Sequence, residues 1–259
     1  MTRIGVDVGG TFTDVVVVDD DGRLRGLKTP STPDRPDDGV VDGLEKAEAE
    51  GVDTATVTFL GHGTTVATNA VLEGDLPETA LVTTEGFRDV LEIGRQDRAD
   101  LYDLDFERPD PLVPRHRRLM VPERVGSDGE VVAPLDDADL DALVDRFPDV
   151  ESVAVSLLFS FRTPDHERRV RDRLREHDED LTISLSSDVL PEFREYERTS
   201  TTALNAALGP VMETYLERLA RRTREAGIER EPAVMQSHGG LTSADAASET
   251  PVNTLLPGP

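Results

Sequence analysis

The chain opens with two apolar runs that a pair of glycines separates, in the segment IGVDVGGTFTDVVVVDD (residues 4–20). A dinucleotide-binding fingerprint places its glycines at the start of a helix, whereas Phe12 and the valines at 15–18 predict a strand here. A Walker phosphate loop needs a lysine after its last glycine, and neither Lys28 nor Lys46 follows a glycine in that way. The spacing therefore predicts a β-hairpin.

The turn of this hairpin carries groups that suit an anion and a metal ion. Glycines let backbone amides approach an anion closely, and Thr11 and Thr13 offer hydroxyl donors. Asp7 and Asp14 can hold metal-bound water. The alternative is an ordinary tight turn without a ligand, and the residues alone leave both interpretations open.

Composition excludes several classes of protein. With 53 acidic and 28 basic residues, the formal charge of -25 repels nucleic acids and anionic membranes, so neither is an expected partner. The sequence has no long apolar run and no signal-peptide pattern. The lack of cysteine removes disulfides, iron–sulfur ligation, thiol catalysis and cysteine zinc sites. We expect a cytoplasmic protein.

The excess of acidic residues is spread along the whole chain, and almost all of the basic residues are arginine. This pattern is typical of a solvated surface that suits high salt. At about 1 M salt the Debye length is roughly 3 Å, so the repulsion between like charges is screened. We therefore expect an acidic, halophilic protein.

The first 83 residues predict a β-β-β-α-β order that continues with a helix and a strand. Strands are expected at residues 3–7, 12–19 and 23–27, a helix at 37–50, and a strand in ATVTFLGHG (55–63). A helix in TTVATNAVLEG (64–74) and a strand at 79–83 follow.

A polar, proline-bearing section at residues 95–134 is expected to be an inserted region, with a hairpin around GSDGE (126–130). The α/β alternation resumes with a helix at 137–147, a strand in SVAVSLLFS (152–160), a helix at 164–177 and a strand in LTISLS (181–186). An amphipathic helix is predicted at 196–226, and Gly209 and Pro210 are expected to kink or split it.

Seven motifs occur in order along the chain: DVGGTFTD, GHGTTVATNAVLEG, GRQDRADLYDL, VPERVGSDGEV, SLLFSFRTPDHERRV, EYERTSTTALNA and MQSHGGL. Together they resemble the A-type branch of the hydantoinase/oxoprolinase family. The resemblance implies an α/β fold of the actin-like ATPase (ribonuclease H-like) type, with a mixed sheet flanked by helices. It also implies ATP with Mg²⁺ or Mn²⁺, and phosphorylation of the carbonyl of a hydantoin, N-methylhydantoin or 5-oxoproline so that water can open the ring.

The same resemblance implies how the chain is divided. Residues 1–190 would form the N-terminal hydantoinase A/oxoprolinase lobe, with the inserted region at about 95–134, and residues 191–259 would begin a second domain. Family members continue past TLLPGP (254–259) with a second phosphate loop and the adenosine pocket. The expected partners are therefore the missing C-terminal lobe and a hydantoinase subunit of the B type, and we expect no turnover by this segment alone.

Under this resemblance the phosphate-binding hairpin has named candidates. The expected nucleotide-binding residues are Gly9, Gly10, Thr11, Thr13 and Asp14. Asp7 is the expected catalytic ligand of magnesium through water, and Asp14 is a second candidate for that task. For Asp14, capping of the hairpin is an alternative role.

The motif GHGTTVATNA places further candidates at a strand-to-helix junction, where free amides favour an anion. His62 is an expected catalytic residue that orients substrate or moves a proton, and Thr64, Thr65 and Asn69 are expected to contact substrate. The alternative is that the threonines only cap the helix, Asn69 lies on the surface and His62 only bonds the loop.

Two later motifs complete the expected site. In EYERTSTTALNA, the acidic Glu195 and Glu197 suit a helix start on dipole grounds alone, whereas Arg198 needs a carboxylate or phosphate partner and is an expected catalytic residue. In MQSHGGL, a polar rim after a strand is expected to contact substrate. Its members are Gln236, Ser237, His238, Gly239 and Gly240. The family commonly has asparagine at the position of His238.

Further functions remain open at this stage. A sugar kinase shares the D-x-G-G-T loop but often carries a cysteine zinc site, which this chain cannot build. Carboxylation of the acetone carboxylase β-subunit type stays open, and so does a non-catalytic nucleotide-binding module.

Overall fold

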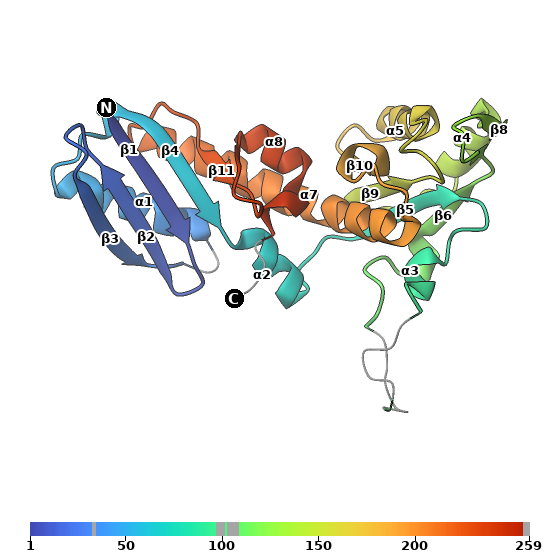
Figure 1. The fold of residues 1–259 in the computed structure, drawn as a ribbon, viewed down its shortest axis with the longest axis horizontal. Helices are drawn as coiled ribbons and strands as arrows, with labels where there is room; N and C mark the ends of the chain where they lie inside the picture. Colours follow the sequence, from blue (N-terminus) through green and yellow to red (C-terminus); the bar gives the residue numbers. More distant parts are fainter. Residues whose placement is uncertain (33–34, 97–101, 103–108, 256–259) are drawn as a thin grey trace. The chain divides into compact units, whose positions relative to one another are not determined.

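The computed structural model describes residues 1–32, 35–96, 102 and 109–255 (Figure 1). The chain forms two compact units: unit 1 comprises Met1–Leu76 and Val211–Pro259, and unit 2 comprises Pro77–Pro210. Unit 2 is thus inserted between two segments of unit 1, and the second boundary falls inside helix α7 (Glu195–Glu225). This division differs from the linear boundary at residue 190.

Unit 1 is built on a six-stranded sheet in the order β12-β11-β4-β1-β2-β3. Its strands are β1 (Thr2–Val8), β2 (Phe12–Val18), β3 (Leu24–Pro30), β4 (Val57–Thr64), β11 (Ala233–Met235) and β12 (Leu241–Thr242). The first three form an antiparallel meander, and β4 runs parallel to both β1 and β11. With α1 (Pro36–Ala49) between β3 and β4, the predicted β-β-β-α-β order is confirmed.

Alternation along the strands separates the two faces of this sheet. Val6 and Val15 are opposite each other and buried, whereas Val16 on the other face is 43% exposed. Helix α1 packs on the buried face through Leu44. The C-terminal part of α7 contacts α1 through the buried carboxylate of Asp37. This carboxylate forms ion pairs with Arg218 at 2.8 Å and with Arg222 at 3.3 Å.

Short elements complete unit 1. They are η1 (Thr54–Thr56) before β4, α2 (Val66–Glu73) after it, and α8 (Ala244–Glu249) and η3 (Pro251–Thr254) after β12. The η3 turn contacts both α2 and α8, so the segment after β12 packs back against α2.

Unit 2 is an α/β/α sandwich on a parallel sheet of order β10-β9-β5-β6 (Figure 1). The strands are β5 (Thr79–Thr84), β6 (Arg118–Val121), β9 (Ser152–Ser156) and β10 (Thr182–Leu185). One face buries apolar residues of α4 (Asp137–Val144) and α5 (Asp165–His177) with Val82 and Val155. The other face buries Leu81 and Ala154 against Ala203 and Ala206 of α7.

Unit 2 also contains smaller elements: α3 (Val90–Ile93), η2 (Arg115–Arg117), the hairpin β7 (Arg124–Val125) with β8 (Val131–Ala133), and α6 (Ser186–Val189). The β7–β8 pairing confirms the predicted hairpin around residues 126–130. The section expected to be inserted also supplies β6, which pairs with β5 in the main sheet. Within that section, residues 97–101 and 103–108 lie outside the described part of the chain.

Two local predictions need correction. The strand expected over 152–160 ends at Ser156, because the next backbone amide, that of Leu157, donates to the carboxylate of Glu167 instead of to a neighbouring strand. Of the two outcomes expected at Pro210, a kink or a split, the split does not occur, because α7 runs from 195 to 225. Packing on both sides of the proline, through the buried Leu208 and Met212, offsets the roughly 3 kcal/mol that an interior proline costs.

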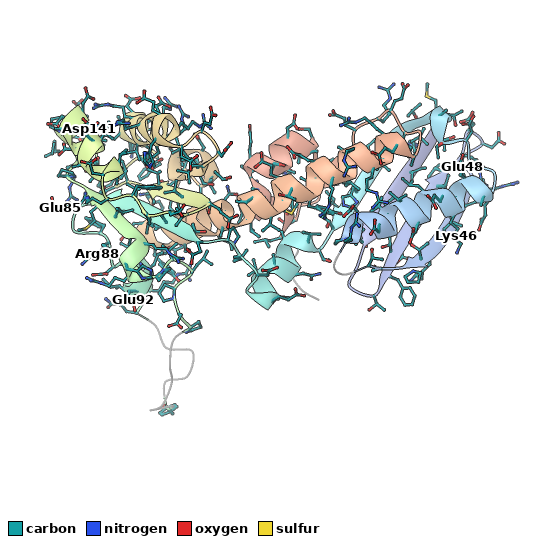
Figure 2. All side chains as sticks on the ribbon, turned by 180° about the vertical axis from the view of Figure 1, so that it is seen from behind. Lys46, Glu48, Glu85, Arg88, Glu92 and Asp141 are labelled. Atoms are coloured by element: carbon teal, nitrogen blue, oxygen red, sulfur yellow. The ribbon has the colours of Figure 1, made fainter. Side chains whose placement is uncertain are left out.

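Among the described residues, no helix combines the length and the apolar character that crossing a bilayer requires. Charged side chains instead cover the outer faces of the elements, as Lys46 and Glu48 on α1 and Asp141 on α4 illustrate (Figure 2).

Candidate functional site

The carboxyl ends of three parallel strands of unit 1 meet at one edge of the sheet. Asp7 near the end of β1 lies opposite Gly63 of β4, and Val8 lies opposite Thr64. On the other side of β4, β11 pairs in parallel register and leads to Gln236. Ligands of α/β proteins bind at such edges. The fold thus brings together the motifs DVGGTFTD, GHGTTVATNA and MQSHGGL.

Backbone contacts at the hairpin turn decide which amides are available. The amide of Gly9 donates to the carbonyl of Phe12 at 3.1 Å, so it is already used inside the hairpin. The amides of Gly10 and Thr11 have no partner among the described residues, and both residues are exposed. A Cβ at Gly10 would meet no atom within 4 Å. The open cradle is therefore formed by Gly10 and Thr11.

Ser31 holds this turn in shape and is not apparent from the sequence pattern. Its hydroxyl donates to the carbonyl of Gly9 at 2.7 Å, and its amide donates to the carbonyl of Thr11 at 3.0 Å. Thr13 is fully buried, with its hydroxyl 3.1 Å from that of Ser31. Thr13 thus contacts Ser31 inside the hairpin instead of being exposed at the turn. The signal for Ser31 was its place directly after β3, which pairs with β2.

Asp7, Asp14 and Lys28 form a row across β1, β2 and β3. Asp14 lies opposite Asp7 on one side and opposite Lys28 on the other. The ammonium of Lys28 lies 3.1 Å from an Asp14 oxygen and 5.0 Å from the centre of the Phe12 ring. Asp14 therefore has a counter-ion, whereas Asp7 has no ion pair among the described residues. This leaves Asp7 as the carboxylate open to a metal ion.

The side chain of Asp7 lies close to Gly63, where the absence of a side chain leaves room for the carboxylate. A Cβ at Gly63 would lie 2.6 Å from Oδ1 of Asp7, so any other residue there would displace the carboxylate. The described part of the chain has no group of three or more His, Cys, Asp or Glu side chains placed to hold a metal ion. A single carboxylate fits Mg²⁺, which proteins hold through one or two carboxylates together with substrate phosphates.

The junction of β4 and α2 is tied to the hairpin. Thr65 donates its hydroxyl to the carbonyl of Val8 at 3.2 Å, and Asn69 approaches the same hydroxyl at 3.5 Å. The hydroxyl of Thr64 accepts the amide of Val66 at 3.2 Å, so Thr64 satisfies one free amide at the start of α2. Thr64 is buried, whereas Thr65 and Asn69 are half-buried. These contacts support the capping alternative for Thr64.

His62 is enclosed beneath this edge. It is 2% exposed, and its Nε2 lies 2.7 Å from the hydroxyl of Tyr215 in α7. Burial lowers the pKa of His62 to about 4, with a small opposing effect from the backbone of Val6. His62 is therefore neutral at pH 7. This burial favours the alternative that His62 bonds its surroundings at the end of β4.

Tyr215 was expected only as part of the apolar face of α7, yet its hydroxyl contacts two polar residues of the motif GHGTTVATNA. It bonds both His62 and the side chain of Thr64, and burial raises the pKa of Tyr215. The periodicity of α7 indicated that Tyr215 would be buried. It did not indicate which polar groups the hydroxyl would meet.

The motif MQSHGGL (235–241) forms the turn between β11 and β12. The amide of Gln236 donates to the carbonyl of Gly240 at 2.8 Å, and Gly239 has a φ of +89°, which favours glycine. Ser237 donates both its amide and its hydroxyl to the carbonyl of Asn253. His238 is exposed, with its ring over Gly240. Gln236 and His238 thus remain available to a ligand.

The motif EYERTSTTALNA (195–206) belongs to unit 2. Arg198 is 1% exposed and donates to the carbonyls of Leu157 at 2.9 Å and Glu192 at 2.7 Å, while its guanidinium lies 5.3 Å from the ring centre of Phe161. The sequence predicts a carboxylate or phosphate as the partner of Arg198, whereas in the structure its guanidinium bonds these two backbone carbonyls. Glu197 pairs with Arg95 at the surface.

Comparisons with known proteins give matches over nearly the whole chain. Residues 3–178 match the family model of the hydantoinase/oxoprolinase N-terminal region, and residues 198–259 match that of hydantoinase/oxoprolinase. The alpha subunit of caprolactamase from Pseudomonas jessenii is 38% identical over 266 residues, which is 99% of this chain and 38% of that protein. 5-Oxoprolinase of Saccharomyces cerevisiae is 30% identical over 304 residues, which is 99% of this chain and 23% of that protein.

Two solved structures share the fold. The nucleotide-free structure of acetone carboxylase has a TM-score of 0.87 at 30% identity and covers 98% of this chain and 38% of that chain. The ATP-dependent caprolactamase from P. jessenii has a TM-score of 0.86 at 36% identity and covers 97% of this chain and 38% of that chain. These likenesses, with the mixed sheet and its flanking helices, confirm the predicted actin-like ATPase lobe.

Proposed function

Because the chain belongs to the hydantoinase/oxoprolinase family, we propose that unit 1 binds the phosphates of ATP and a magnesium ion within an enzyme that opens a cyclic amide. The proposed substrates are a hydantoin, N-methylhydantoin or 5-oxoproline. A lactam carbonyl is a poor electrophile, and ATP supplies the phosphoryl group that activates it. The chain spans 38% of the length of the caprolactamase alpha chain, so the activity is proposed for a longer protein or complex.

One observation carries this proposal. At the carboxyl edge of the sheet, two exposed amides without partners, those of Gly10 and Thr11, lie in the turn that follows Asp7, whose carboxylate has no ion pair among the described residues. Amides that point to solvent favour an anion, and a carboxylate beside them suits the metal ion that accompanies phosphates. Thr65, Asn69, Gln236, His238, Gly239 and Gly240 are the further residues that we propose for substrate contacts.

The direct test measures phosphate release from ATP. The whole protein, with its expected B-type partner subunit, is supplied with Mg²⁺-ATP and with 5-oxoproline or N-methylhydantoin. We expect release that depends on the cyclic amide, and none from residues 1–259 alone until a separately expressed C-terminal lobe is added. Release that no cyclic amide stimulates would contradict the proposal and favour a non-catalytic nucleotide-binding module.

Carboxylation is the second candidate, because the acetone carboxylase structure matches as well as the caprolactamase structure does. The same assay with acetone and bicarbonate distinguishes the two. ATP consumption that requires bicarbonate and acetone, and not a cyclic amide, would assign the chain to the carboxylase type.

A further inference from the structure

The peptide group between Gly9 and Gly10, in the turn that joins β1 to β2 (Figure 1), has a bonded end and an open end. Its carbonyl, that of Gly9, accepts the hydroxyl of Ser31 at 2.7 Å. Its N–H, that of Gly10, has no partner among the described residues. The C=O and N–H of a planar trans peptide point in opposite directions, and no described peptide bond is cis. By holding the carbonyl, Ser31 therefore aims the N–H of Gly10 away from itself, on the exposed side of the turn.

Little else in the described part of the chain restrains this peptide group. A glycine stands on each side of it, and glycine accepts a wide range of backbone angles. A Cβ at Gly10 would meet no atom within 4 Å, and no backbone amide of the described residues donates to the carbonyl of Gly9. A reversed peptide group would present its carbonyl oxygen on the exposed side, and that oxygen would repel an anion. The Ser31 hydroxyl thus decides between the two orientations.

A second hydroxyl supports the first. A hydroxyl has one proton, and Ser31 gives its proton to Gly9, so across the 3.1 Å contact with Thr13 the donor is Thr13. Thr13 is fully buried, and a Cβ at Gly39 of α1 would lie 2.8 Å from its hydroxyl oxygen. Consecutive hydrogen bonds polarise one another. The chain from Thr13 through Ser31 to the Gly9 carbonyl therefore also makes the N–H of Gly10 a stronger donor.

We propose that Thr13 and Ser31 are positioning residues, which hold the Gly9–Gly10 peptide group so that the N–H of Gly10 faces a phosphate group. The identity of the ligand rests on the proposed function, whereas the orientation of the peptide group does not. Neither hydroxyl touches the ligand. They raise its affinity because an anion binds only the outward orientation of the N–H, and the apparent affinity scales with the fraction of molecules in that orientation.

The first test measures this orientation without a ligand. The residual dipolar coupling of the Gly10 N–H is recorded by NMR for the weakly aligned chain. We expect the unmodified chain to show the coupling of one fixed orientation, Ser31→Ala to show a reduced coupling because two orientations are averaged, and Ser31→Thr, which keeps the hydroxyl, to restore it. Thr32→Ala is the matched control, since the Thr32 hydroxyl bonds the carbonyl of Arg35 at 2.6 Å and not the turn. An unchanged coupling in Ser31→Ala would overturn the proposal.

The second test removes the donor behind Ser31. Thr13→Val keeps the shape of the buried side chain but deletes its hydroxyl, so the Ser31 hydroxyl keeps its bond to Gly9 and loses its own support. We expect the Gly10 coupling to change in the same direction as in Ser31→Ala, but by less. A coupling that changes in Thr13→Val and not in Ser31→Ala would contradict the proposed order of the hydrogen bonds. This variant also decides the matter if Ser31→Ala does not fold.

The third test uses the whole protein with its partner subunit and measures ATP consumption with a cyclic amide. We expect Ser31→Ala to raise KM for ATP about fivefold, the factor that one net hydrogen bond supplies. The value of kcat should change less than about twofold, because a bound phosphate selects the same peptide orientation in both proteins. Ser31→Thr should restore KM, and Thr32→Ala should leave it unchanged. A lower kcat at constant KM would contradict a role in binding.

The outcomes separate this proposal from the proposed function. A protein that consumes no ATP with any cyclic amide, but whose Gly10 coupling falls in Ser31→Ala, keeps the positioning residues and loses the function. An enzyme whose ATP consumption depends on a cyclic amide, but in which Ser31→Ala changes neither the coupling nor KM, keeps the function and loses the positioning residues.

Discussion

Nε2 of His62 lies 2.7 Å from the hydroxyl oxygen of Tyr215, although 153 residues separate them in the chain. The pair joins β4, which carries one site motif, to α7 of the same unit. Both side chains are enclosed, and the Tyr215 hydroxyl is the side-chain partner of the His62 ring among the described residues.

Removal of this hydroxyl should destabilise unit 1. Tyr215→Phe leaves Nε2 of His62 buried without a partner, which costs about 1–3 kcal/mol. We expect a lower midpoint in urea unfolding, followed by circular dichroism. Tyr196→Phe is the matched control, because the Tyr196 hydroxyl has no hydrogen bond among the described residues, and it should change the midpoint little. Equal effects of the two substitutions would contradict the role of the pair.

The buried histidine should also make stability depend on pH. Since the pKa of His62 is about 4 in the folded chain and 6.5 in the reference state, the unfolded chain binds the proton more readily between these values. Its contribution is fully present above pH 6.5 and falls by about 3 kcal/mol as pH approaches 4. The measurement is the difference in unfolding free energy between the unmodified chain and His62→Gln across this range. A difference that does not change with pH would show that His62 is not buried as described.

Gly10→Val should remove nucleotide binding without harm to the fold. Its Cβ meets no protein atom, so the added side chain would occupy only the space proposed for a phosphate. We expect ATP-dependent ring opening by the whole protein to be lost while the melting temperature stays the same. Gly26→Val, equally open but on β3 away from the turn, is the control and should keep activity. Asp7→Ala should also abolish turnover. Near-normal turnover in both Gly10→Val and Asp7→Ala would remove the hairpin from the active site.

Lys28 should govern how many carboxylates a metal ion meets. Lys28→Gln frees Asp14 to act with Asp7, so we expect Mn²⁺ to bind several-fold more tightly in a titration followed by electron paramagnetic resonance. The stability should fall by less than about 1 kcal/mol, because the ion pair is exposed. Lys46→Gln, which changes the other lysine, is the control. Equal Mn²⁺ affinity in the two variants would show that Lys28 does not compete with the metal.

High salt should stabilise the chain. With a formal charge of -25, screening relieves self-repulsion, so the melting temperature should rise as potassium chloride increases from dilute to molar. A melting temperature that stays constant or falls over this range would argue against a protein adapted to saline conditions.

Local pattern was sufficient for much of the fold. The alternation of valines in β2, the two glycines before Phe12 and the helical spacing in α1 each involve neighbours in the chain, so they were readable without tertiary contacts. Asp7 was likewise predicted as a candidate from its place at the end of an apolar strand. The α7 helix shows the limit, since Pro210 predicted a kink or a split, and the helix continues through it with buried residues packed on either side.

The sequence by itself thus determined the hairpin, the order of the elements and the polar motifs at strand ends, because these depend on residues close together in the chain. Only the tertiary structure decided the roles within the site. Ser31 bonds the carbonyls of Gly9 and Thr11, whereas the amides of Gly10 and Thr11 have no partner among the described residues. Lys28 forms an ion pair with Asp14 and not with Asp7. Hydrogen bonds and ion pairs are short-range, so a polar group's role follows from the partner that folding brings within about 3 Å of it, and spacing along the chain does not reveal that partner.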